Sequence, residues 1–425
     1  AVAVLVQKDV EAPENITVVK IPNTRYGLAH VSDKFFNHPS GRFNLIGITG
    51  TKGKTTTTFM VKNILEACGH KVGLIGTVRN MIGDETVYVG RNTTPESYDL
   101  QSLFAEMAEK EVEDVVMEVS SQGLQLHRVS CCDFDIGVFT NIYKDHISPL
   151  EHKDMDEYLS AKIKLFKMCK KGLINIDSNF SERVLKEAEC ETYTFGVEKD
   201  CDIRAYDIVK HSDSVEFKVD SKWIKGGIKV NIPGMFSVYN ALAAIGVCTL
   251  MGVPYEAIRK GLESVNVPGR FEIVSSGTDF TVIVDYAHTA DSLENILNAV
   301  KDFARGRIIC VFGCGGNKDR NRRFGMGEVS GRMADLTVIT SDNPRSEDPL
   351  AIINDIETGI KKTRGEYIKI VDRREAIKYA IENAKAGDVV IIAGKGHETY
   401  QIFKDKTIHF DDREVAKEIL REICT

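Results

Sequence analysis

The 425-residue sequence lacks the features of secreted and membrane-spanning proteins. Its ten cysteines are scattered and form neither CxxC pairs nor a disulfide-like spacing, so we expect reduced, free thiols. No apolar run approaches the roughly 20 residues that a membrane span needs, and the first residues are not a basic segment followed by an apolar one. These absences predict a cytoplasmic protein.

An excess of positive charge is also absent. The 55 Lys and Arg residues against 62 Asp and Glu residues give a formal net charge of -7, which provides no global field for nucleic acid or an acidic membrane surface. We therefore expect small-molecule substrates and no nucleic-acid or membrane partner. We also expect a monomer, although the sequence itself does not give the oligomeric state. With 43% hydrophobic residues, a chain of this length exceeds one core and predicts two or three domains.

What the sequence does contain is an alternation of strand-like and helix-like segments. From residue 43 to about 266, apolar runs such as "FNLIGI" and "DVVMEV" alternate with helical periodicity, which predicts an α/β fold with a mostly parallel sheet. Shorter alternating runs at 200–232 suggest an antiparallel patch. The segment "NVPGRFE", at 266–272, indicates an interdomain hinge, and the alternation after it predicts a second α/β domain.

The stretch "GITGTKGKTTTT", residues 47–58, lies between a predicted strand and a predicted helix. It departs from the G-x-x-x-x-G-K-[ST] pattern because Ile48 replaces the first glycine. Gly50 and Gly53 would still let backbone N–H groups face phosphates, while Lys54 neutralises phosphate oxygens and the Thr55 hydroxyl binds Mg²⁺. The alternative is a tight turn with a solvated lysine.

Other polar clusters follow the carboxyl ends of predicted strands, where parallel sheets bind ligands. Glu118 ends one strand and could complete a Mg²⁺ shell begun by Thr55. His146 follows the next strand and is a borderline ligand for that ion. Taken alone, Glu118 would more often be a solvated strand end, and His146 a capping or core residue.

Ten further motifs follow this loop in order: "TTPE", "EVSSQGLQLHRV", "TNIYKDH", "YLSAKIKLF", "PGMFSVYNALAA", "PGRFE", "DYAHT", "GCGG", "DNPR" and "GKGHE". With them the chain resembles the Mur ligases of peptidoglycan synthesis, above all the branch that adds the third amino acid to UDP-N-acetylmuramoyl-dipeptide. The resemblance implies a P-loop ATP-binding domain at 41–267 and a Rossmann-like amino-acid-binding domain at 268–425. It also implies that residues 1–40 are the remnant of an N-terminal uridine-nucleotide domain.

The resemblance further implies an ATP-dependent amide ligase with an acyl-phosphate intermediate. The expected ATP-binding residues are Thr49, Gly50, Thr51, Lys52, Gly53, Lys54, Thr55, Thr56, Asn240, Arg270, Asp285 and His288. The expected metal ligands are Thr55, Glu118, His146 and Lys162, the last as an N6-carboxylysine formed with CO₂; Lys54, Glu118, His146 and Lys162 are the expected catalytic residues. Thr93, Thr94, Ser120 and Arg128 are expected to bind the nucleotide-peptide, although singly such residues are more often caps and surface groups.

Arg345 in "SDNPRSEDP" bears on which amino acid is added. Its guanidinium suits the distal carboxylate of meso-diaminopimelate and would repel the ammonium of L-lysine. The other expected pocket residues are Lys318, Asp342, Asn343, Gly394 and Glu398, with Glu398 taking the distal ammonium. Lys318 is a departure, because diaminopimelate-adding relatives usually carry an arginine there.

Three alternatives remain open at this point. Arg345 could serve only as an ion-pair partner of Glu347 or Asp348. The same ligase chemistry could use L-lysine or another amino acid. The chain could also be a non-catalytic P-loop nucleotide-binding paralogue that binds ATP without turnover.

Overall fold

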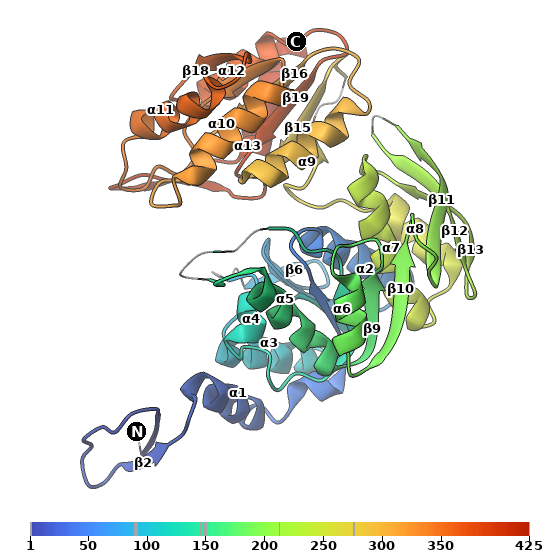
Figure 1. Cartoon of the computed structure of the whole chain (residues 1–425), viewed down its shortest axis with the longest axis vertical. Coiled ribbons are helices and arrows are strands. Elements are labelled where there is room, and N and C mark those ends of the chain that lie inside the picture. Colours follow the sequence, from blue (N-terminus) through green and yellow to red (C-terminus); the bar gives the residue numbers. More distant parts are fainter. Residues whose placement is uncertain are drawn as a thin grey trace. The chain divides into compact units, whose positions relative to one another are not determined.

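A computed structural model describes residues 2–88, 92–144, 147, 151–211, 213–274 and 277–424 (Figure 1). They form two compact units, the first of Ala1–Ile208, Glu216–Val230 and Phe236–Val265, and the second of Val209–Val215, Asn231–Met235 and Asn266–Thr425. The three-domain division itself stays a prediction. Within the described residues, no helix combines the length and apolarity that crossing a membrane requires.

Residues 2–42 precede the main sheet of the first unit. Strands β1 (Ala3–Val6) and β2 (Thr17–Lys20) pair in parallel, and helix α1 (Thr24–Phe35) follows. Asn23 starts this helix because its side-chain oxygen accepts the N–H groups of Arg25 and Tyr26. A short 3-10 helix, η1 (Pro39–Arg42), then leads into the main sheet.

The main sheet of the first unit has the strand order β13-β12-β11-β10-β9-β8-β3-β7-β4-β5-β6. The bounds are β3 (Asn44–Thr49), β4 (Val72–Ile75), β5 (Asn80–Ile82), β6 (Glu85–Tyr88), β7 (Asp114–Glu118), β8 (Phe134–Phe139), β9 (Cys169–Asn175), β10 (Glu191–Gly196), β11 (Ile203–Lys210), β12 (Val215–Ser221) and β13 (Lys225–Val230). The pairs from β4 through β11 are parallel, which confirms the predicted mostly parallel sheet. Short turns join β11, β12 and β13, at the patch that the sequence had set apart.

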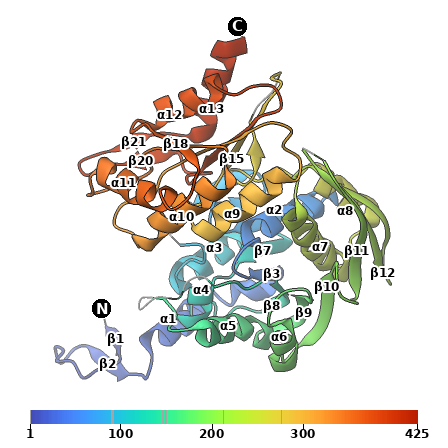
Figure 2. The same ribbon diagram turned by 45° about the horizontal axis from the view of Figure 1, so that its top comes forward.

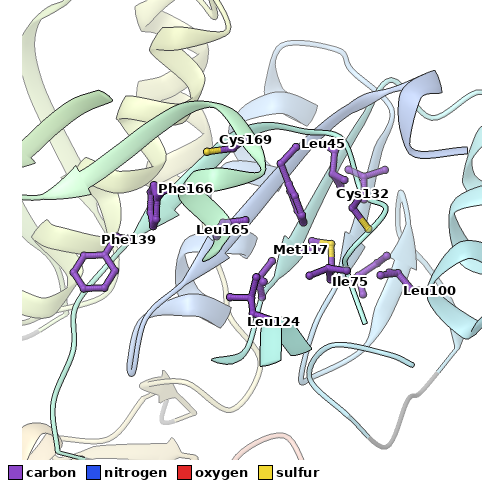
Figure 3. Packing of buried hydrophobic residues seen from close by; sticks show 14 of the residues in the cluster. Leu45, Ile75, Leu100, Met117, Leu124, Cys132, Phe139, Leu165, Phe166 and Cys169 are labelled. Carbon is purple, nitrogen blue, oxygen red and sulfur yellow. The ribbon is translucent and has the colours of Figure 1, made fainter. Parts of the chain in front are cut away.

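Helices cover both faces of this sheet. The strands β3 and β7 are apolar on both faces and therefore need this cover. Helices α2 (Lys54–Ala67), α7 (Met235–Leu250) and α8 (Tyr255–Glu263) lie on one face (Figure 2). The other face is covered by α3 (Ser97–Glu109), α4 (Ser121–Gln125), α5 (Met155–Ile163), η2 (Lys164–Lys167) and α6 (Ser181–Glu187). On that face Leu45, Ile75 and Met117 of the strands pack toward Leu100 and Leu124 of the helices (Figure 3).

The second unit has a six-stranded sheet of order β14-β15-β19-β16-β17-β18, parallel except for β14. Its strands are β14 (Glu272–Ile273), β15 (Thr281–Asp285), β16 (Ile308–Phe312), β17 (Leu336–Ile339), β18 (Glu366–Lys369) and β19 (Val389–Ala393). Helices α12 (Arg373–Glu382) and α13 (Asp412–Cys424) pack on one face, and α9 (Ala290–Lys301), α10 (Asn321–Met333) and α11 (Pro349–Ile360) on the other. The predicted Rossmann-like arrangement is confirmed. A hairpin of β20 (Tyr400–Ile402) and β21 (Thr407–His409) follows β19.

A buried ion pair fixes the carboxyl ends of two of these strands. Arg373 and Asp412 have fully buried side chains, and Nη2 of Arg373 lies 2.7 Å from Oδ2 of Asp412. The same guanidinium donates to the carbonyl oxygens of Ala393, at the end of β19, and Ser341, just after β17. A buried guanidinium needs hydrogen-bond acceptors for its N–H groups. Arg373 therefore holds the chain in place where the loops after β17 and β19 begin.

Candidate active site

The phosphate-type loop of the first unit runs from the end of β3 at Thr49 to the start of α2 at Lys54. Gly53 has φ of +85°, and a side chain there would overlap Oδ1 of Asn240 on α7. Asn240 is buried, so it packs directly on the loop. Only glycine fits this position, because the conformation and the close approach both exclude a Cβ atom.

Two lysine ammonium groups meet at the same carbonyl of this loop. Nζ of Lys54 donates to the carbonyl oxygens of Gly50 at 2.8 Å and Thr51 at 3.1 Å. Nζ of Lys162 donates to the carbonyl oxygen of Gly50 at 2.9 Å, although Lys162 belongs to α5 and is only 1% exposed. It also lies 4.5 Å from the ring centre of Tyr158. The fold thus brings two predicted catalytic residues together.

Glu118, at the end of β7, faces the first turn of α2. Its carboxylate is 1% exposed and accepts a hydrogen bond from Oγ1 of Thr55 at 3.0 Å. Thr77, just after β4, donates to the same carboxylate from its backbone N–H at 2.8 Å and its hydroxyl at 3.0 Å. Thr77 was not predicted, although its place after a strand end is the same signal that indicated Glu118.

Thr140 and Asn141, just after β8, hydrogen-bond to the phosphate-type loop at Lys52. The backbone N–H of Lys52 donates to Oδ1 of Asn141 at 2.9 Å, and the hydroxyl of Thr140 donates to the carbonyl oxygen of Lys52 at 2.7 Å. The Thr51 hydroxyl bonds with the hydroxyl of Tyr158 at 3.0 Å. Thr56 is buried in α2. His146, a predicted metal ligand, lies outside the described residues.

The four predicted nucleotide-peptide residues form one cluster beside Glu118. The Thr94 hydroxyl donates to the backbone carbonyl of Glu118 at 2.9 Å and accepts from the backbone N–H of Ser120 at the same distance. Arg128 donates to the carbonyl oxygen of Thr94 at 3.0 Å. Thr93 joins through its hydroxyl, which lies 3.0 Å from that of Thr77 and donates to it, because the Thr77 hydrogen is used on Glu118.

The three predicted ATP residues of the second unit lie near the start of its sheet. The Asp285 carboxylate accepts backbone N–H groups of Phe271 and Ala287, so it orders its own loop. The guanidinium of Arg270 lies 4.6 Å from the ring centre of Tyr286. His288 is exposed and packs edge-on against the same ring. The side chains of Arg270 and His288 therefore both contact the ring of Tyr286.

A cavity of about 180 Å³ opens beside these residues in the second unit. Every predicted amino-acid-binding residue lines it. Its full lining is Tyr286, His288, Gly313, Cys314, Gly315, Lys318, Asp319, Arg322, Asp342, Asn343, Arg345, Gly394 and Glu398. Burial raises the pKa of Tyr286 to about 12 and raises that of Cys314 further, so both remain neutral near pH 7.

The guanidinium of Arg345 lines this cavity and is held by backbone carbonyls. Nη1 of Arg345 donates to the carbonyl oxygens of Gly316 at 3.0 Å and Asn343 at 3.5 Å, and no ion pair of Arg345 occurs within the described residues. The alternative pairing with Glu347 or Asp348 is not seen, because Glu347 binds Arg323 and Asp348 caps α11.

The backbone of Arg345 has φ of +54°, which is uncommon for a residue with a side chain. The hairpin after β19 holds it there, since the N–H of Arg345 donates to the carbonyl oxygen of Ile402 at 3.0 Å. The N–H of Ile402 in turn donates to Oδ1 of Asn343 at 2.9 Å. The hairpin was not singled out in the sequence, because nothing local indicates which distant loop it contacts.

Glu398 faces the cavity with one oxygen already occupied. Its Oε2 accepts from Nδ2 of Asn343 at 2.8 Å and from Nζ of Lys395 at 3.0 Å. Lys395 is fully buried behind the wall and was not predicted as a site residue, although it lies within "GKGHE". The arrangement leaves Oε1 of Glu398 as an acceptor for a ligand cation.

Comparisons with known proteins place this geometry in a family context. A family model described as the Mur ligase middle domain matches residues 48–248, and one described as the Mur ligase, glutamate ligase domain matches residues 269–396. A UDP-N-acetylmuramoyl-L-alanyl-D-glutamate–2,6-diaminopimelate ligase of Caldanaerobacter subterraneus subsp. tengcongensis is 50% identical over 423 residues, which cover 99% of this chain and 87% of the relative. A ligase of the same name from Clostridium botulinum is 48% identical over 98% of this chain and 86% of its own.

Solved structures agree with this relationship. One described as a UDP-N-acetylmuramoyl-L-alanyl-D-glutamate–2,6-diaminopimelate ligase superposes with a TM-score of 0.71 at 28% identity, covering 100% of this chain and 87% of that one. A folylpolyglutamate synthase of Mycobacterium tuberculosis superposes with a TM-score of 0.73 at 17% identity over 93% and 95% of the two chains. The second similarity concerns the fold alone.

Proposed function

Since the chain belongs to the Mur ligase family of ATP-dependent acid–amino-acid ligases, we propose that it joins meso-diaminopimelate to UDP-N-acetylmuramoyl-L-alanyl-D-glutamate. The choice of amino acid is carried by one observation, the cavity wall. Among the described residues, the guanidinium of Arg345 has no acidic partner there, and the hydrogen bonds of the Glu398 carboxylate go to its Oε2. Diaminopimelate ends in a carboxylate and an ammonium, which match these two groups. Lysine has only the ammonium at that end.

The reaction consists of two displacements. The terminal carboxylate of the nucleotide-peptide attacks the γ-phosphorus of ATP, which forms an acyl phosphate and releases ADP. The amine of the amino acid then attacks the acyl carbon, and the tetrahedral adduct loses phosphate to leave an amide. We assign Lys54 and the loop N–H groups to the phosphate oxygens, because both steps bring anions together and need their charge neutralised.

The residues around Glu118 fit a Mg²⁺ ion. Oγ1 of Thr55 and Oε1 of Glu118 are oxygen donors 3.0 Å apart, and oxygen is the ligand that this hard cation prefers. When bound, Mg²⁺ would screen the phosphate charge. We propose Thr55 and Glu118 as its ligands, together with His146 and a carbamate on Lys162 as the family resemblance implies.

Phosphate release measured with each amino acid in turn tests this function. We expect release that depends on ATP, on UDP-N-acetylmuramoyl-L-alanyl-D-glutamate and on meso-diaminopimelate, with little release in the presence of L-lysine. Turnover with lysine and none with diaminopimelate would show the alternative specificity. ATP binding without any amino-acid-dependent release would show a non-catalytic nucleotide-binding protein.

Arg345→Ala should separate amino-acid binding from ATP use. Loss of a charged hydrogen-bonding partner is expected to raise the KM for diaminopimelate roughly 10- to 100-fold and to leave the KM for ATP within about twofold. Arg332→Ala is the matched control, because that arginine forms an exposed ion pair with Glu294 on the surface. An equal rise in both KM values would instead assign Arg345 to the nucleotide.

A further inference from the structure

The loop from β16 into α10 carries four cations, of which two are committed to structure. Nη2 of Arg320 lies 2.7 Å from Oδ1 of Asp355, and Nη2 of Arg323 lies 2.8 Å from Oε1 of Glu347. Nη1 of Arg323 also reaches Oδ2 of Asp355 at 3.0 Å. Hydrogen bonds from Arg323 lower the pKa of Glu347, and those from Arg320 lower that of Asp355, so both carboxylates stay charged and occupied.

The other two cations, Lys318 and Arg322, line the cavity and have no ion pair within the described residues. The side chains of Lys318 and Arg345 lie close together, next to Gly315. A Cβ atom added to Gly315 would lie 2.9 Å from Nη1 of Arg345 and 3.7 Å from Cγ of Lys318, so both side chains pass over this glycine. Two cations at one place suit a single carboxylate.

Arg322 remains as a third cation in the same cavity, and diaminopimelate has a second carboxylate. Resting on the proposed function, we propose that Arg322 binds the α-carboxylate beside the amine that reacts, while Arg345 and Lys318 bind the distal one. A guanidinium holds a carboxylate through two parallel hydrogen bonds, which fixes direction as well as position. Arg322 would thereby orient the attacking amine. Arg322 would bind the α-carboxylate of any amino acid, whereas Arg345 would select amino acids that have a distal carboxylate.

The test compares Arg322→Ala with Arg345→Ala in the full protein. Arg322→Ala should raise the KM for meso-diaminopimelate roughly 10- to 100-fold without changing the KM for ATP, and Arg322→Lys should recover part of the loss. L-Lysine serves as the second probe, as a competitor of diaminopimelate. Because lysine keeps the α-carboxylate and lacks the distal one, its inhibition constant should rise in Arg322→Ala. It should not rise in Arg345→Ala, where a group that repels the lysine ammonium is removed.

Several results would overturn the assignment. An unchanged KM for diaminopimelate in Arg322→Ala, or the same change in the control Arg332→Ala, would remove Arg322 from the site. A higher KM for diaminopimelate with an unchanged lysine inhibition constant would move Arg322 to the distal carboxylate. Calorimetric titration with diaminopimelate separates the two proposals, since binding lost in Arg322→Ala supports this inference even if turnover fails. If Arg322→Ala still turns over and binds diaminopimelate as tightly as the unmodified protein, the inference about Arg322 is refuted and the proposed ligase function is not.

Discussion

Lys54→Ala is expected to lower ATP-dependent phosphate release at least about 10³-fold, comparable to removing a charge that stabilises a phosphoryl-transfer transition state. Lys54 starts α2, and its ammonium donates to the carbonyl oxygens of Gly50 and Thr51. A phosphate would offer this ammonium a stronger, charged acceptor within the same loop. Initial rates of phosphate release at saturating substrates measure the effect.

The control for this variant is Lys110→Ala, which removes an exposed lysine paired with Glu106 at the end of α3. Its rate should equal that of the unmodified protein. Lys54→Ala should also keep its thermal unfolding temperature within a few degrees, because the lost bonds are local to the loop. A Lys54→Ala variant with near-normal turnover would mean that the loop holds something other than the reacting phosphates.

The second large effect is expected for Lys162→Ala, with turnover again reduced about 10³-fold. Lys162 is only 1% exposed and donates to the phosphate loop, and keeping an ammonium buried at this place is costly. Reaction with CO₂ would convert it into an anion that suits the metal site implied by the resemblance. The amine attacks the carbon of CO₂ and loses a proton, which gives an N6-carboxylysine.

Formate, a small carboxylate, should restore part of the activity of Lys162→Ala, because it can occupy the space of the lost carbamate. It should not restore Lys54→Ala, where the missing group is a cation. Lys164→Ala removes an exposed lysine two residues along the chain and should have no effect. Full activity of Lys162→Ala in CO₂-depleted buffer would contradict the modified-lysine assignment.

Much of the architecture could be predicted because parallel α/β sheets follow a strong rule. Apolar strands buried on both faces are distinctive in a sequence, and their carboxyl ends mark one edge. That rule predicted Glu118 as a site residue. In the structure its carboxylate accepts a hydrogen bond from Thr55, which lies 63 residues away in the sequence. The same edge supplies Thr77, so this residue was within reach of the reasoning that missed it.

Contacts that depend on how distant loops meet were not predictable. The sequence offered Glu347 and Asp348 as neighbours of Arg345, yet both carboxylates find closer donors in Arg323 and in the α11 backbone. Charge proximity along the chain is therefore a poor guide to ion pairing here, because the loop turns through a left-handed residue at Arg345. Backbone angles of that kind are set by tertiary contacts, which no local pattern encodes.

The bracing of Arg345 by the hairpin after β19 has a consequence for exchanging specificity between related enzymes. The tetrapeptide "DNPR" does not fold into its shape by itself, since its backbone bonds run to Ile402 and its Asn343 side chain to Glu398 and Lys395. Grafting these four residues onto another scaffold would transfer the chemical groups without their orientation. We therefore expect residues 342–345 to keep their orientation on another scaffold only when residues 394–409 are transferred with them.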